Sequence, residues 1–122
     1  MALSPTSLVE EAARAAADKK ADDVVVLDVQ ELLGITDYFL ICSGSSHRQV
    51  RTISDEIVKR LRDAGASPVR REGERDAGWI LIDYEDFVVH VFGQQERQFY
   101  DLERLWKDAP RVTVLGAEEA TG

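Results

Sequence analysis

The stretch that decides the fold is GWILIDYEDFVVHVF, residues 78–92. It contains two runs rich in strand-favouring residues, 79–84 and 87–92, which are separated only by Glu85 and Asp86. Two-residue connections are the shortest loops that join antiparallel strands. The stretch therefore predicts a β-hairpin, and the length of its loop predicts the register.

This register assigns each side chain of the hairpin to one of two faces. With Tyr84 opposite Phe87, Leu81 lies opposite His90, and opposed residues share a face. One face then carries Trp79, Leu81, Asp83, Val88, His90 and Phe92, and the other carries Ile80, Ile82, Tyr84, Phe87, Val89 and Val91. Because the second set is more uniformly apolar, we expect it to lie beneath helices, while the mixed first face meets something else.

The segments before the hairpin predict a helix and two strands. Helix-start signals at Ser4-Pro5 precede apolar residues at helical spacing, which continue up to Lys19-Lys20. The apolar runs 24–27 and 38–42 are typical of strands buried on both faces. Residues 29–36 carry only weak signals for a turn or for an extension of strand pairing, so we assign them no secondary structure.

A second helix follows these strands. Apolar residues step by three or four from Val50 to Ala64, and Gly65 is placed as a C-terminal stop. Beyond it, residues 68–71 predict a short edge strand, because Pro68 cannot donate to a central ladder.

A third helix is predicted from about Gln95 to Lys107. Its core stripe is expected to contain Phe99, Leu102, Leu105 and Trp106, which fall within one arc of the helix. Tyr100 and Glu103 lie at the rim of that stripe, where an aromatic ring beside a carboxylate suits recognition.

These elements predict a single α/β (α+β) domain over residues 1–110, followed by a flexible tail over residues 111–122. We expect one mixed sheet of about five strands with helices packed mainly on one side. A chain of 122 residues has room for one core only.

Composition excludes several classes of protein. No apolar run is long enough to cross a bilayer, and the acidic Glu10 and Glu11 oppose a transit peptide, so we expect a cytoplasmic protein. The lone Cys42 lies in an apolar run and is expected to be an inert buried thiol. With only His47 and His90 as histidines, a metal site is not expected.

The charge pattern favours a basic protein partner over nucleic acid. The chain has 15 Lys+Arg against 23 Asp+Glu, a net charge of −8. Residues 83–108 contain seven acids and three bases, so this stretch has a net charge of −4, half of the net charge of the chain. Aromatic residues within an acidic rim are typical of a docking surface for a basic protein. The basic side of the second helix lacks interleaved aromatic residues, so we read it as a solvated face.

One enzymatic alternative stays open at this stage. The Ser43-Gly44-Ser45-Ser46 loop follows a strand and precedes a helix, as phosphate-binding loops do. Nucleotidyl transfer would use Ser45, Ser46 and Asp83, and it would need a second carboxylate to hold a divalent metal. A plain turn with an N-cap serine explains the same residues. The third class of function considered is a domain that only forms dimers.

Three strings resemble one known family: TDYFLICSGSS at 36–46, GWILIDYEDFVVHVF at 78–92 and FYDLERLW at 99–106. Together they look like the ribosomal silencing factor, or Iojap, family over about residues 8–110. The resemblance implies a non-enzymatic, often homodimeric factor without a cofactor, whose fold is related to nucleotidyltransferases. It also implies binding to protein fourteen of the large ribosomal subunit, a block on joining of the small subunit, and lower translation when nutrients are scarce.

The resemblance also implies a partner-binding set in this chain. Its members are Trp79, Leu81, Asp83, His90, Tyr100, Leu102, Glu103 and Trp106. One position departs from the family pattern, because Glu85 stands where the family usually has glycine. Glutamate disfavours a positive φ, so this residue affects which type of turn the hairpin forms and therefore the register of its strands.

Overall fold

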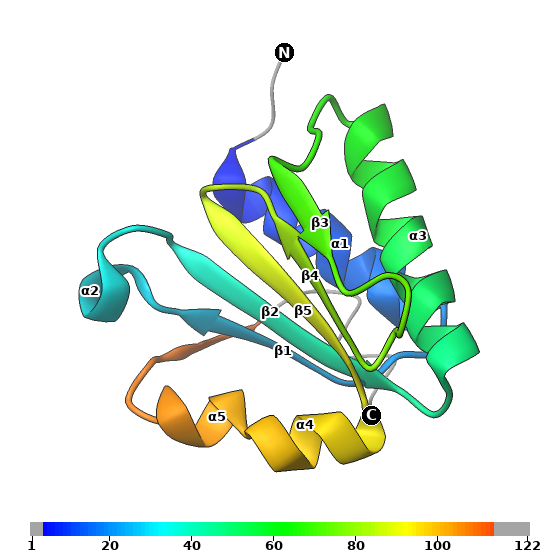
Figure 1. The fold of residues 1–122 in the computed structure, drawn as a ribbon. Helices are drawn as coiled ribbons and strands as arrows, with labels where there is room; N and C mark the ends of the chain where they lie inside the picture. The colour runs from blue at the N-terminus through cyan, green and yellow to red at the C-terminus, as the bar shows by residue number, and fades with distance from the viewer. Residues whose placement is uncertain (1–3, 114–122) are drawn as a thin grey trace.

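The computed structural model describes residues 4–113 and contains one mixed, six-stranded sheet in the order β3-β4-β5-β2-β1-β6 (Figure 1). The strands are β1 (Asp22–Asp28), β2 (Tyr38–Gly44), β3 (Arg70–Glu72), β4 (Trp79–Asp83), β5 (Phe87–Gly93) and β6 (Arg111–Val112). The helices are α1 (Pro5–Asp18), α2 (Gln30–Leu33), α3 (His47–Asp63), α4 (Gln94–Tyr100) and α5 (Leu102–Leu105). The β2–β5 pair is parallel and all other pairs are antiparallel.

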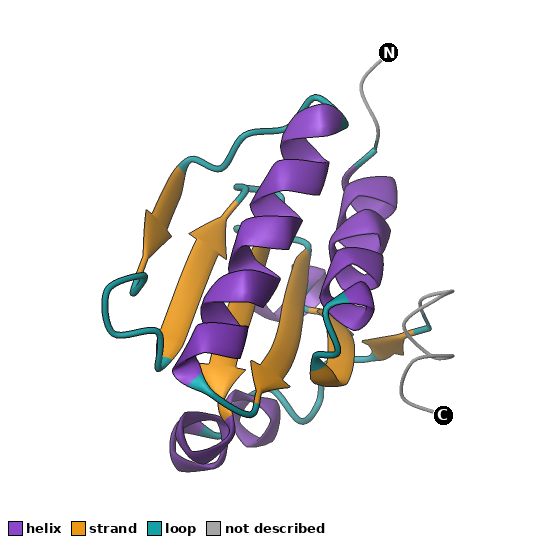
Figure 2. Cartoon of the chain, turned by 90° about the vertical axis from the view of Figure 1, so that its right-hand side faces the viewer, coloured by secondary structure: helices purple, strands orange, loops and turns teal. Residues whose placement is uncertain are grey.

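The two long helices cover one face of the sheet, as Figure 2 shows, and α4 and α5 lie against the other face. The predicted α+β class with a single mixed sheet is therefore confirmed. The sheet has one strand beyond the expected five, because Arg111 and Val112 pair with Leu27 and Val26 of β1. The expected tail thus begins with two paired residues, while residues 114–122 lie outside the described part of the chain.

The main core lies between the sheet and the helices α1 and α3. Ala12, Ala13, Ala15 and Ala16 of α1 are fully buried in it, and their small side chains let the helix lie close to its neighbours. The α3 residues Val50, Ile53, Ile57 and Leu61 are also fully buried, as their spacing predicts. Serines cap both helices, since Ser4 accepts from the amide of Ser7 and Ser46 from that of Gln49.

The hairpin register agrees with the prediction at every pair. Asp83 lies opposite Val88, Leu81 opposite His90 and Trp79 opposite Phe92. The predicted helix-facing set, Ile80, Ile82, Tyr84, Phe87, Val89 and Val91, belongs to the main core. The opposite face contributes to a second, smaller core, in which Phe92 is buried and Trp79 and Val88 are partly buried.

The prediction of one continuous third helix is wrong, because the structure has two short helices there, α4 and α5. The helix is broken at Asp101, whose backbone is left-handed with φ 48° and ψ 52°, a conformation that aspartate tolerates better than most residues. The break ends the regular helical spacing, so the predicted stripe is only half correct. Leu102 and Trp106 pack against the second core, whereas Phe99 is 82% exposed and Leu105 is 69% exposed.

The hairpin turn is strained at Glu85. Its φ is +73°, and the amide of Asp86 donates to the carbonyl of Tyr84 at 2.8 Å, which closes a three-residue turn around it. The carboxylate of Asp83 accepts from the Glu85 amide at 2.8 Å and helps to hold this conformation. A side chain at positive φ costs about 1–2 kcal/mol.

We expect Glu85→Gly to raise the free energy of unfolding by about 1 kcal/mol, because glycine adopts a positive φ without steric cost. Urea denaturation of both proteins measures the difference. Asp86→Gly is the matched control, since Asp86 is not at positive φ and glycine there gains nothing. Equal stabilisation by both substitutions would contradict this account of the turn.

Candidate functional site

The sheet face turned away from α1 and α3 carries a continuous row of rings, which we call the aromatic band. Its members come from β2, β4, β5, α4 and the residue that follows α5: Phe39, Trp79, His90, Phe92, Phe99, Tyr100 and Trp106. Strand alternation brings the sheet members to one face, because Phe39 pairs with Val88 and Trp79 pairs with Phe92.

Trp79 is the junction of the aromatic band. Its ring centroid lies 4.6 Å from that of Tyr100, 4.9 Å from Phe92 and 5.9 Å from His90. These separations are those of favourable aromatic pairs. Tyr100 remains 47% exposed and Phe99 is exposed beside it, so this end of the band faces solvent.

His90 lies near the middle of the band and is a neutral imidazole. It is 5% exposed, and burial lowers its pKa from 6.5 to about 4. Its Nδ1 accepts a hydrogen bond from the Nε1–H of Trp79 at 3.1 Å. Since the indole nitrogen can only donate, the histidine carries its proton on Nε2.

We expect this burial to make the protein less stable as the pH falls from 6.5 to 4. The unfolded chain takes up a proton at His90 below pH 6.5, whereas the folded chain does so only near pH 4. Acidification therefore favours the unfolded state, by up to roughly 3 kcal/mol for this group.

Chemical denaturation at several pH values, compared between the native chain and His90→Asn, isolates this contribution. Asparagine keeps an oxygen near the position of Nδ1 and has no titrating group. The carboxylates affect both proteins alike, so the native chain should lose more stability than the variant over this range. Parallel pH profiles would contradict the assignment of a neutral, buried His90.

Beside the band lies a recess of about 390 Å³, which opens at the hairpin-turn end of the sheet. Its apolar lining consists of Leu33, Ile35, Phe39, Leu81, Val88 and Trp106. Thr36 and His90 also line it, and Arg70, Asp83 and Glu85 add charged groups. Arg70 and Asp83 form an ion pair at 3.4 Å, which leaves the Glu85 carboxylate as the net charge of the recess.

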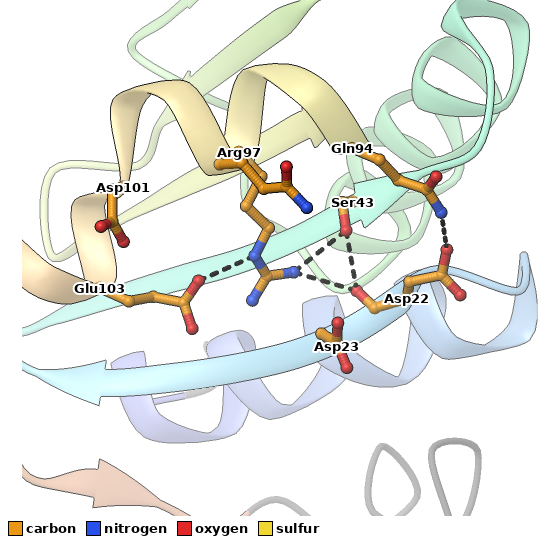
Figure 3. Close-up of a pocket in the computed structure, with 8 residues that line it drawn as sticks. Asp22, Asp23, Ser43, Gln94, Arg97, Asp101 and Glu103 are labelled. Carbon is orange, nitrogen blue, oxygen red and sulfur yellow. Dashed lines mark hydrogen bonds and ion pairs between the residues drawn. The ribbon is translucent and has the colours of Figure 1, made fainter.

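A second, polar groove of about 480 Å³ lies between β1 and α4 (Figure 3). Arg97 crosses it, with its side chain only 11% exposed, and donates from Nε to Glu103 at 2.8 Å. Its Nη1 donates to the Asp22 carbonyl at 3.2 Å and to the Ser43 hydroxyl at 3.1 Å. Gln94 adds a hydrogen bond to the Asp22 carboxylate at 2.8 Å. Arg97 thus ties α4 to the centre of the sheet and to the residues after the Asp101 break.

We expect Arg97→Gln to lower the free energy of unfolding by roughly 2 kcal/mol, because it leaves Glu103 without its hydrogen-bond donor and removes one of the two side-chain donors to the Asp22 carbonyl. Arg104→Gln makes the same change in charge at an exposed site with no ion pair among residues 4–113, and it should be nearly neutral. Thermal denaturation of both variants measures the contrast. Similar losses in the two proteins would contradict the structural role of Arg97.

Seven of the eight sequence-predicted binding residues lie in or beside the aromatic band and the recess. Trp79, His90, Tyr100 and Trp106 are members of the band, Leu102 packs against the same core, and Leu81 and Asp83 line the recess. Glu103 is the exception. Its carboxylate accepts from Arg97 and lies 3.7 Å from Nη2 of Arg111, so it faces the polar groove.

Sequence reasoning missed several residues of this region. Phe39 could have been found by extending the face alternation to its strand. Thr36 and Ile35 fall in the segment left unassigned, where α2 begins from Val29 without a side-chain cap and Gly34 closes it at a φ of 74°. Nothing in the sequence indicated a structural role for Arg97, because its partners Asp22 and Ser43 lie more than fifty residues away in the chain.

The geometry does not favour nucleotidyl transfer. Asp83 lies level with Phe39, whereas Ser45 and Ser46 follow the end of β2 at Gly44, which is five residues further along and about 16 Å away. The amide and hydroxyl of Ser45 both donate to the side chain of Gln49, so they are already paired. Within residues 4–113, no group of three or more His, Cys, Asp or Glu side chains could hold a metal ion.

The buried thiol prediction is confirmed. Cys42 is fully buried, and this burial raises its pKa to about 12. In the part of the chain that the structure describes, no helix is long and apolar enough to span a membrane.

The fold and the site define the class of protein. One sheet face is buried beneath α1 and α3, and the other presents linked rings that end in an exposed tyrosine and phenylalanine. Exposed aromatic and apolar groups of this kind mark surfaces that bind other proteins. The molecule is therefore a small α+β domain with one face covered by two long helices and an opposite face of the kind that suits binding to another protein.

Comparison with known proteins identifies the family. The model of the family described as "Ribosomal silencing factor during starvation" matches residues 2–121. A relative from Halalkalibacterium halodurans named Ribosomal silencing factor RsfS is 45% identical over 114 residues, which cover 93% of this chain and 97% of that protein. A Bacillus subtilis relative of the same name is 43% identical over 108 residues, covering 88% of this chain and 92% of that protein.

A solved structure supports the same assignment. The crystal structure of a protein from Bacillus halodurans matches with a TM-score of 0.79 at 42% identity, covering 89% of this chain and 99% of that chain. The chain belongs to the ribosomal silencing factor family. The resemblance seen in its sequence is thereby confirmed, and its relation to nucleotidyltransferases stays a prediction.

Proposed function

We propose that this protein binds the large ribosomal subunit through ribosomal protein fourteen and blocks joining of the small subunit. It would thereby repress translation when nutrients are scarce. Membership of a family described by silencing during starvation supports the proposal. The observation that carries it is the aromatic band, whose exposed end at Phe99 and Tyr100 has no covering element among residues 4–113.

The charge of the molecule fits this partner. Ribosomal proteins that contact RNA are generally basic, and a net charge of −8 attracts such a protein while repelling the RNA around it. Aromatic anchors supply most of the affinity at interfaces of this kind, and carboxylates supply orientation and association rate. The partner-binding set proposed from the sequence contains both kinds of group.

The mechanism we propose is steric and requires no catalysis, cofactor or metal ion. A folded domain seated on the subunit-joining surface occupies space that the small subunit needs. The protein would act in the cytoplasm as one domain, and we propose a homodimer as its state away from the ribosome. Binding at the aromatic band would compete with any self-association through the same face.

Tyr100→Ala tests the proposal, because Tyr100 is half exposed and its removal leaves both cores intact. We expect the variant to bind large subunits about thirtyfold more weakly, which corresponds to about 2 kcal/mol for a central anchor. Co-sedimentation with separated subunits measures binding, and light scattering on the same samples measures subunit joining.

Thr52→Ala is the matched control, since Thr52 is an exposed α3 residue on the opposite side of the sheet. It should bind and inhibit joining like the native chain. A folded Tyr100→Ala protein that sediments normally with large subunits would contradict the proposed surface. Absence of the native chain from both subunits would contradict the proposed function itself.

A further inference from the structure

The recess contains two buried polar atoms without hydrogen-bond partners. They are the hydroxyl oxygen of Thr36 and Nε2 of His90, and their residues are 7% and 5% exposed. Among the described residues, only one other buried side-chain atom shares this condition, the hydroxyl of Tyr84. Buried polar groups are normally satisfied, so two orphans in the wall of one recess call for a specific explanation.

The protonation state of His90 shows what its free nitrogen offers. Because Nδ1 accepts from Trp79, Nε2 bears the hydrogen and is a donor. His90 lines the recess and Trp79 does not, so the unpaired Nε2 edge lies on the side of the imidazole away from Trp79, in a residue of the recess wall. The ring of Phe39 meets the imidazole at a steep angle with 4.9 Å between centroids, a contact that offers at most a weak N–H···π interaction in place of a carbonyl acceptor.

The remaining lining describes the chemistry of the occupant. Apolar side chains form most of the wall, and two residues in it, Thr36 and His90, each hold a buried donor without a partner. Such a site suits an apolar side chain together with the main-chain carbonyls that flank it. The charge left over at the recess is the carboxylate of Glu85, which favours a basic segment and disfavours a second copy of this acidic chain.

We propose that this recess receives an apolar side chain from a basic segment of the protein partner, whose main-chain carbonyls accept hydrogen bonds from Nε2 of His90 and the hydroxyl of Thr36. The inference rests on the proposed function and adds to it a second anchor point beside the aromatic band. Both donors lie just beneath the recess wall, so binding displaces wall side chains. Ile35, which is 83% exposed, is the one most free to move.

Thr36→Val tests the inference, because it removes the hydroxyl and keeps the shape of the side chain. In the free protein the change replaces an unpaired buried hydroxyl with a methyl group, so the melting temperature should rise or stay the same. Affinity for the large subunit should fall about fivefold to tenfold, the value of one hydrogen bond. Substitution of a residue with a purely structural role would not weaken subunit binding while the melting temperature rises or stays the same.

Thr52→Val is the control, since its hydroxyl bonds to the Arg48 carbonyl within α3, far from the recess. It should leave subunit binding unchanged. If a folded Thr36→Val protein binds like the native chain while Tyr100→Ala binds weakly, the proposed role of the recess is contradicted. The proposed function is then still supported. Failure of the native chain to bind large subunits would instead overturn the proposed function.

An independent measurement follows the imidazole directly. Nitrogen-detected spectra of selectively labelled His90 should show the Nε2–H tautomer in the free protein. In complex with isolated ribosomal protein fourteen, the Nε2 proton should shift downfield as it gains an acceptor. A complex that forms without any change at Nε2 would overturn the assigned role of His90.

Discussion

The pairing of β4 with β5 is the constraint on which the rest of the molecule depends. It places Leu81 opposite His90 and Ile82 opposite Val89, which separates the face that carries the aromatic band from the core face. A slip of β4 by one residue would move Trp79 and Leu81 beneath α3 and turn Ile80 and Ile82 towards the opposite face. The register is retained even though Glu85 must adopt a positive φ, so burial of the apolar set outweighs strain in the turn.

The two faces then follow different physical rules. The main core is closely packed, with alanines on α1 and branched residues on α3, and it needs no polar contact to define it. The opposite face is held by rings and by directional bonds, such as the one from Trp79 to His90. Aromatic rings with a polar edge suit a surface that is partly buried in the free protein and wholly buried in a complex.

The sequence predicted those parts of the structure that follow from local periodicity. Strand alternation placed the hairpin side chains correctly, and helical spacing located α1 and α3 within a few residues. Periodicity failed at Asp101, because one left-handed residue breaks the helix without any change in hydrophobic pattern. It also could not place Glu103, whose partner Arg97 is itself held by Asp22 and Ser43 across the sheet. Contacts between distant segments leave no periodic signal, and the placement of Glu103 depends on them.

The same distinction explains where a binding surface can arise in so small a domain. Where every buried polar group already has a hydrogen-bond partner, binding another protein gains no hydrogen-bond energy. An unpaired buried donor, by contrast, raises the free energy of the unbound state by about 1–3 kcal/mol. A partner that supplies the missing acceptor recovers that energy only in the bound state, and it does so with directional specificity. His90 can act in this way because Trp79 fixes its tautomer and burial keeps it neutral, so its donor persists across the physiological range of pH. The aromatic band would then provide affinity, while the recess would select the partner.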